Sequence, residues 1–186
     1  MSENSIRIRP LHCGSIRVSP LMPYGGARDL KRSARMAYAP DAERIDLPCI
    51  AWLIEHPKAR ILVDTGLCRE ISPEGEYDRD AVKRVLPAAL ASLYRPWVPM
   101  GQTAAEQLAA FGIKSSDLDY VLLTHLDPDH ICGLRELSEA KHILCSQEDM
   151  WWSYRTVYRL RQPHALWRPY PIETFWYKGS PEGTNR

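Results

Sequence analysis

The alternation of apolar and polar residues predicts that the first part of the chain is rich in β-strands. The segment Ser5–Val18 alternates at both of its ends, as strands with one buried face do. Four later apolar runs have the length of strands: Cys49–Glu55, Arg60–Val63, Tyr120–Thr124 and Ile143–Cys145. The first two of these runs flank His56-Pro57-Lys58, so we expect them to form a β-hairpin.

Helical spacing appears between and after these strands. Apolar residues recur on one helical face of Thr103–Phe111, and the pair Thr103 and Glu106 predicts a capping box at its start. Three further segments are expected to be helical: Asp80–Tyr94, Cys132–Ala140 and the residues from Ser146 to Met150.

Two long stretches have no clear strand pattern. Tyr24–Ala39 is rich in Gly, Arg and Lys, and we expect it to form a loop over the mouth of a site. Leu67–Gly101 holds several prolines and, apart from its helical segment, predicts a lid or binding loop. From Trp151 the chain is rich in aromatic residues and arginine. Such a segment can stack nucleic-acid bases, but a cover packed on the sheet is favoured.

Composition indicates one ordinary globular domain over residues 1–186. The chain is 45% hydrophobic and 25% charged, which suffices for a core, and its net charge of +1 gives no reason to expect nucleic acid or a membrane as partner. No apolar run is long enough to span a bilayer and the N-terminus has no signal-peptide pattern, so a cytoplasmic location is expected. The five cysteines are widely spaced without a Cys-x-x-Cys pair, which argues against a disulfide framework.

The candidate chemistry lies directly after the strand Tyr120–Thr124. Four residues able to bind a metal fall within six positions: His125, Asp127, Asp129 and His130. Residues two apart in an extended segment point the same way, and Pro128 can begin a helical turn that carries the last two. Imidazoles and carboxylates converging at a strand-to-helix turn suit a divalent cation. Cys132 follows closely, and either approaches the metal or, as favoured, packs as a small hydrophobic residue.

The segment Thr124-His-Leu-Asp-Pro-Asp-His130 resembles the His-x-His-x-Asp-His signature of the metallo-β-lactamase superfamily, within it the N-acyl homoserine lactonase branch. Ile54–Gly66 is similar to that family's hairpin ending in an Asp-Thr-Gly turn, and Leu108–Thr124 is similar to the helix and loop before its metal strand. The resemblance, which runs from about Ile6 to about Trp152, implies an α/β fold of the αββα sandwich type. It covers only the first half of that sandwich, so an apolar sheet face should be left uncovered.

The chain departs from the family pattern in two ways. Asp127 stands where the family has its second histidine, and this carboxylate still keeps the i, i+2 relation to His125. It tilts the site from zinc toward manganese or iron. In addition, the family's third histidine, bridging aspartate and last histidine have no counterpart, since neither His142 nor His164 lies in a matching turn.

The resemblance implies roles for the residues that do match. His125 and Asp127 would bind a first metal, and Asp129, the candidate catalytic residue, would bind a second with His130. Asp64 would orient a ligand histidine from behind, or else would only stabilise its own turn. The cofactor would be one or two divalent ions, zinc first, with manganese or iron as alternatives.

The activity implied by the resemblance is quorum-quenching hydrolysis of a small-molecule lactone or ester. A metal-bound hydroxide would attack the carbonyl. Because half of the ligands are missing, we expect weak or absent turnover from this chain alone. Two alternatives stay open: a catalytically inactive metal-binding remnant, and a half-domain that completes its site with another polypeptide, including a homo-oligomer.

Overall fold

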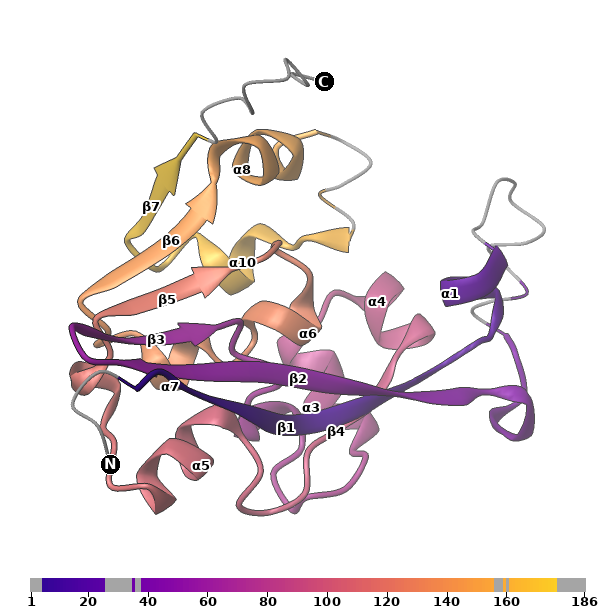
Figure 1. Ribbon diagram of the computed structural model, residues 1–186. Helices are drawn as coiled ribbons and strands as arrows, with labels where there is room; N and C mark the ends of the chain where they lie inside the picture. The colour runs from indigo at the N-terminus through magenta and orange to yellow at the C-terminus, as the bar shows by residue number, and fades with distance from the viewer. Residues whose placement is uncertain (1–4, 26–34, 36–37, 156–158, 160, 177–186) are drawn as a thin grey trace.

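The computed structural model describes residues 5–25, 35, 38–155, 159 and 161–176, and its centre is a seven-stranded mixed sheet (Figure 1). The strands lie in the order β4-β1-β2-β3-β5-β6-β7. Neighbours from β4 to β3 are antiparallel, and neighbours from β3 to β7 are parallel. The strands are β1 (Arg7–Val18), β2 (Ile45–His56), β3 (Ala59–Val63), β4 (Arg95–Trp97), β5 (Tyr120–Leu123), β6 (His142–Ser146) and β7 (Ile172–Phe175).

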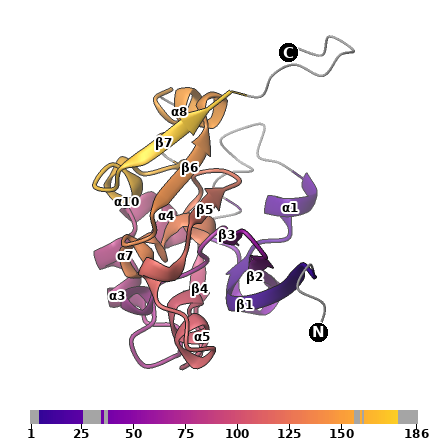
Figure 2. The same cartoon turned by 60° about the vertical axis from the view of Figure 1, so that its left-hand side comes forward.

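The helices of the described residues are short. They are α1 (Leu21–Gly25), α3 (Arg79–Val85), α4 (Ala88–Leu93), α5 (Ala104–Ala110), α6 (Pro128–Ile131), α7 (Leu134–Leu137), α8 (Gln147–Ser153) and α10 (His164–Trp167). Helices α3, α4, α7 and α10 lie on one side of the strands, while α1 lies on the other (Figures 1 and 2). Three single 3-10 turns are η1 (Asp41–Glu43), η2 (Arg69–Ile71) and η3 (Ser115–Asp117). Within this described part, no helix has both the length and the apolar character that crossing a bilayer demands.

The strands expected from the apolar pattern are confirmed, with two additions, β4 and β7. Ser5–Val18 forms the long strand β1, which bulges between His12 and Ser15 where Gly14 takes a φ of 89°. The hairpin forms as β2 and β3, with Trp52 opposite Val63. The first, β4, lies inside the segment expected to be only a lid or loop. Its three residues, Arg95, Pro96 and Trp97, are too short a run to show alternation. The second, β7, lies inside the aromatic segment expected to be only a cover and pairs in parallel with β6.

One expected helix is divided in the structure and another is shorter than expected. The segment Asp80–Tyr94 becomes α3 and α4, because Pro87 has no backbone N–H and forces Leu86 into an extended conformation. The segment Cys132–Ala140 forms only the short helix α7. Cys132 instead caps the end of the preceding helix α6, which starts at Pro128. Two expectations are confirmed as made. Thr103 and Glu106 form a capping box on α5, and Ser146 caps α8.

Two of the expected segments fall largely or partly on residues outside the description. The proposed loop over the site, Tyr24–Ala39, is described only at its ends and at residue 35. The aromatic segment after Trp151 is described in part. There, Leu166 and Trp167 of α10 are buried against the core, which is the covering role expected of this segment.

The two faces of the sheet differ in burial. One face carries the core, including Leu53, Leu62 and Val121, all with exposed fractions of 0%, and helices α3 and α7 lie on one side of the strands in Figure 2. The residues that alternate with these form an apolar row across four strands: Trp52, Val63, Leu122 and Leu144. Trp52 is 44% exposed and the other three are partly exposed. The expected uncovered apolar sheet face is therefore present among the described residues.

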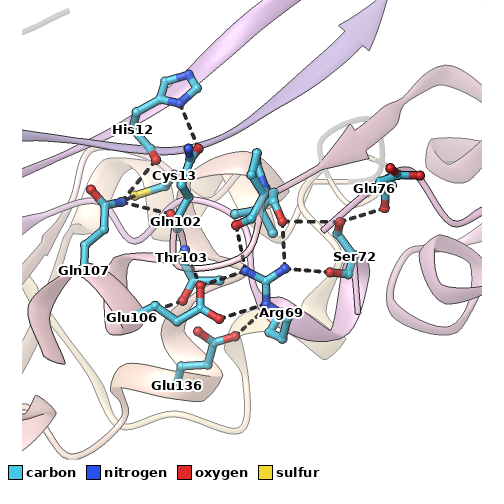
Figure 3. Close-up of polar contacts among 12 residues, drawn as sticks. His12, Cys13, Arg69, Ser72, Glu76, Gln102, Thr103, Glu106, Gln107 and Glu136 are labelled. Carbon is cyan, nitrogen blue, oxygen red and sulfur yellow. Dashed lines mark hydrogen bonds and ion pairs between the residues drawn. The ribbon is translucent and has the colours of Figure 1, made fainter. Parts of the chain in front are cut away.

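Arg69, the first residue of η2, makes hydrogen bonds to several other parts of the domain (Figure 3). Its guanidinium donates to the Glu106 carboxylate at 2.7 and 2.9 Å, and to the carbonyl oxygens of Val98 and Pro99 at 2.7 and 2.9 Å. The backbone N–H of Arg69 donates to the Glu136 carboxylate at 2.5 Å. One side chain thus holds η2, α5 and the chain after β4 together, because a guanidinium presents five donors in a fixed fork.

We expect the uncovered sheet face to bind a hydrophobic dye. Wild-type protein should enhance the fluorescence of anilinonaphthalene sulfonate under native conditions, because an apolar row of this length is unusual on a protein surface. Trp52→Lys should reduce the enhancement by placing a charge in the row. Tyr24→Lys is the matched control, since Tyr24 is 82% exposed in α1 and not in the sheet. No enhancement in the wild type would show that this face is covered in solution.

Replacing Arg69 by Gln should lower the free energy of unfolding by about 2 kcal/mol, because buried carbonyls lose their donors. Arg69 also lowers the pKa of Glu106 through the hydrogen bonds between them. The folded-state pKa lies below the unfolded value, so this contribution is present above about pH 4.5 and is lost as the pH falls further. Urea unfolding of wild type and Arg69→Gln at pH 7 and pH 3.5 should show a smaller difference at the acid pH. An equal difference would contradict the assignment.

Candidate metal centre

The centre is organised by Asp64, at the end of β3. This residue has a φ of 59°, a left-handed conformation that Asp tolerates better than most residues with a side chain. Its Oδ1 accepts the backbone N–H of Thr124 at 2.8 Å, and its Oδ2 accepts from His130 Nδ1 at 2.8 Å. The Thr124 hydroxyl lies 2.8 and 3.0 Å from the two carboxylate oxygens. The carboxylate therefore points into the candidate site and does not cap its own turn.

The turn after Asp64 also holds the helix that carries His130. Thr65 donates to the His130 carbonyl oxygen through its backbone N–H at 2.7 Å and through its hydroxyl at 2.8 Å. Gly133 approaches so closely that a Cβ there would lie 2.4 Å from the Thr65 carbonyl oxygen. A larger residue at Gly133 would push α6 away from the turn. Pro128, the first residue of α6, begins this helix as the sequence predicts.

His130 lies between two carboxylates. Its Nδ1 is hydrogen-bonded to Asp64, and its Nε2 faces Asp129, whose Oδ2 is 3.5 Å away. Burial alone would lower the pKa of His130, but the hydrogen bonds that its imidazole donates to the Asp129 and Asp64 carboxylates raise it to about 10. In the absence of a metal the imidazole is therefore a cation that pairs with both acids. A metal bound at Nε2 must displace that proton.

His125 and Asp127 form the other half of the site. The His125 ring lies 3.9 Å from the His130 ring between centroids, and its Nε2 is 3.4 Å from Asp127 Oδ2. Its Nδ1 lies 3.0 Å from the Thr124 hydroxyl. Both ring nitrogens of His125 thus face protein groups.

Asp127 is buried and is paired with a segment about 35 residues further along the chain. Arg161 donates to Asp127 Oδ2 through Nε at 2.5 Å, and its Nη2 lies at the same distance. Gln162 Nε2 donates to Oδ1 at 3.3 Å. Burial raises the pKa of Asp127, but the hydrogen bonds from His125 and Arg161 outweigh it and hold the pKa below the ordinary value. Asp127 is therefore an anion with protein partners on both oxygens.

The donor set does not fit a two-ion centre. Within the described part of the chain, no three His, Cys, Asp or Glu side chains are arranged to hold one metal ion. The Asp127 half is filled by Arg161 and Gln162. Asp129 and His130 are the pair that suits a single ion, because Asp64 holds His130 by the far nitrogen and leaves Nε2 available.

The remaining sequence candidates lie outside this cluster. His142 is exposed on β6, where its Nδ1 is 2.8 Å from Glu173. His164 lies between aromatic rings in α10, with Nε2 at 3.1 Å from the Ser153 carbonyl oxygen. Cys132 is 2% exposed and lies beside Cys68, whose hydrogen bond raises the pKa of the Cys132 thiol. The favoured interpretation of Cys132, packing as a buried residue, agrees with these contacts.

Comparison with known families decides the relationship. The family model described as the metallo-beta-lactamase superfamily matches residues 44–178, nearly three quarters of the chain. The chain belongs to the metallo-β-lactamase superfamily. Among curated members, it is 34% identical over 96 residues to a probable metallo-hydrolase of Mycobacterium tuberculosis. That match covers 52% of this chain and 28% of the relative. It is 26% identical over 105 residues to the N-acyl homoserine lactonase AttM of Agrobacterium fabrum, covering 55% of this chain and 36% of AttM.

Solved structures of lactonases share the fold of this chain. A variant of Bacillus thuringiensis AiiA, with N-decanoyl-L-homoserine bound at its active site, superposes with a TM-score of 0.64 at 17% identity. The superposition covers 94% of this chain and 62% of that one. The dizinc quorum-quenching lactonase AidC, in complex with its product, superposes with a TM-score of 0.54 at 16% identity, covering 97% and 61%. The chain thus spans less than two thirds of each of these two structures.

Three contacts of this superfamily site were missed by sequence reasoning. Arg161 and Gln162 lie about 35 residues beyond Asp127 and within no motif; an unpaired acid at a position where the family has histidine was the available signal. Tyr94, 8% exposed, belongs to an apolar pocket that also includes Asp129, and burial there raises the pKa of its hydroxyl. Tyr94 reaches this pocket because it caps the end of α4, directly before β4, and no motif in the sequence marks it.

Asp64→Ala should destabilise the protein by about 2–4 kcal/mol. Alanine at a positive φ is strained, and Thr124 and His130 lose a buried acceptor. Asp64→Asn is the matched control, because Asn tolerates the same φ and keeps one acceptor oxygen, so its loss should be smaller. Chemical denaturation of both variants measures this. Equal stability of Asp64→Ala and the wild type would contradict the organising role of Asp64.

Proposed function

We propose that this chain is a metal-dependent hydrolase of the lactonase type, with a small-molecule lactone or ester as substrate. Its own residues provide one ion position, formed by Asp129 and His130, and turnover by the chain alone is weak. The observation that carries the proposal is the Asp64–His130–Asp129 arrangement, in which a carboxylate holds a histidine so that its free nitrogen faces a second carboxylate. Membership in a superfamily with curated metallo-hydrolases and lactonases supports it.

Each residue of the arrangement has a separate task. Asp64 fixes the ring orientation of His130, because both are held by the Thr65 and Thr124 hydrogen bonds. His130 Nε2 and Asp129 Oδ2 provide one neutral and one anionic ligand atom for an ion of the zinc, manganese or iron type. A divalent ion held there would supply polarisation of the substrate carbonyl and a water of lowered pKa.

Asp129 and Pro128 border a small apolar cavity of about 10 Å³. Its other walls are mainly aliphatic and aromatic: Ile16, Leu67, Ile71, Leu86, Tyr94 and Pro96. This volume holds about one water molecule and no hydrocarbon substituent. The proposal of a lactone or ester substrate therefore rests on the relatives and not on this cavity.

One observation favours a second candidate, a metal-binding form without catalytic activity. Asp127 and His125, which the family resemblance assigns to a first metal, have protein partners in this structure. A site that lacks half of its ligands is expected to lose more than the ~10–100-fold that follows from changes in the outer contacts. The assay below separates this candidate from the hydrolase.

Metal content and hydrolysis together test the proposal. Wild type equilibrated with zinc or manganese should bind about one ion per chain, weakly because only one pair of side chains holds it, and should hydrolyse an acyl-homoserine lactone or a short-chain aryl ester slowly. Asp129→Asn and His130→Ala should lose both the metal and the hydrolysis. His142→Ala is the matched control, since His142 lies exposed on β6 and pairs with Glu173. Metal bound without any hydrolysis would support the inactive form. Wild-type metal content in His130→Ala would contradict the site.

A further inference from the structure

The guanidinium of Arg161 lies where a cation is needed. Asp127 is 4% exposed, and a buried carboxylate without a positive or hydrogen-bonding partner is strongly unfavourable. Two nitrogens of Arg161 meet the same carboxylate oxygen at 2.5 Å, and Gln162 meets the other. These contacts satisfy the acid without a metal ion.

The segment that carries Arg161 is fixed to the site by packing. Immediately after Gln162, which is itself 4% exposed, α10 begins at His164 and places the buried Leu166 and Trp167 against the core. His164 contacts the Ser153 carbonyl oxygen, which ties the same segment to α8. These contacts place Arg161 beside Asp127, although the Arg161 side chain is itself 59% exposed. The pair differs from an ion pair between two exposed side chains because the carboxylate is buried.

The neighbouring imidazole follows the same arrangement. His125 directs Nε2 toward Asp127 Oδ2 and Nδ1 toward the Thr124 hydroxyl. A dication bound to Asp127 would have to displace or adjoin the guanidinium, whose positive charge repels it. Asp129 interacts with the Arg161 guanidinium only through its charge, without the direct 2.5 Å contact that Asp127 makes, and its Oδ2 lies 3.5 Å from His130 Nε2.

We propose that Arg161 is a built-in counter-ion for Asp127, which takes the place of one divalent cation and leaves this chain a single metal position at Asp129 and His130. The inference rests on the proposed function for that remaining position. It also explains why a carboxylate is stable at residue 127, where the resemblance places a neutral imidazole. Asp127 then joins Arg161 and Gln162 to the turn that follows β5.

Arg161→Gln tests the inference, with Arg159→Gln as the matched control. Both variants remove one arginine charge from the same exposed stretch, but only Arg161 contacts Asp127. Without metal, Arg161→Gln should melt at a lower temperature than wild type, and Arg159→Gln should not. Adding zinc should raise the melting temperature of Arg161→Gln more than that of wild type, because a dication now neutralises Asp127. Equal zinc-induced shifts in Arg161→Gln and wild type would overturn the inference.

If Arg161→Gln folds poorly, the variant Asp127→Asn provides a second test. Asp127→Asn should keep the zinc stoichiometry of the wild type in calorimetric titration, because Asp127 holds no ion. Loss of zinc in Asp127→Asn would overturn the inference. The double variant with Arg161→Gln should recover the metal-free melting temperature, since both charges of the pair are gone; no recovery would also count against it.

Zinc binding by the wild type alone tests the proposed function, separately from the counter-ion. Wild type that binds no zinc contradicts the metal position at Asp129 and His130. The comparison between Arg161→Gln and Arg159→Gln is then still decisive for the counter-ion. A zinc-induced shift confined to Arg161→Gln supports it, and the absence of any difference between these two variants overturns it.

Discussion

The hydrogen bonds of one carboxylate determine the geometry of the whole site. Asp64 accepts from the backbone and hydroxyl of Thr124 and from His130, and so joins the end of β3 to the end of β5 and to α6. The strained backbone of Asp64 is maintained by these contacts together with the Thr65–His130 bonds. Remove this carboxylate, and neither the orientation of His130 nor the distance from His130 to Asp129 is fixed.

The charged side chains of the site are paired with one another. His130, as a cation, lies between Asp64 and Asp129, and Asp127 accepts from Arg161. A metal ion at His130 Nε2 would replace a proton, whereas one at Asp127 would compete with the Arg161 guanidinium. The metallo-β-lactamase fold is combined here with a site in which Asp127 already has protein partners, and the proposed single metal position lies at Asp129 and His130.

Sequence reasoning predicted what depends on local pattern. The hairpin before Asp64, the strand before Thr124 and the capping box of Thr103 all follow from spacing within a few residues. It also grouped the four candidate ligands, since they share one turn. The partner of Asp127 escaped prediction because Arg161 reaches it only through the packing of α10, which no local pattern encodes. The edge strand β4 escaped because three residues cannot show alternation.

The most direct measurement is an anomalous difference map at the zinc edge, from crystals grown with zinc. The account predicts one zinc ion within about 2.2 Å of Asp129 and His130, with the Arg161 guanidinium still on Asp127. Zinc bound to Asp127 with Arg161 displaced, or two ions side by side, would contradict it.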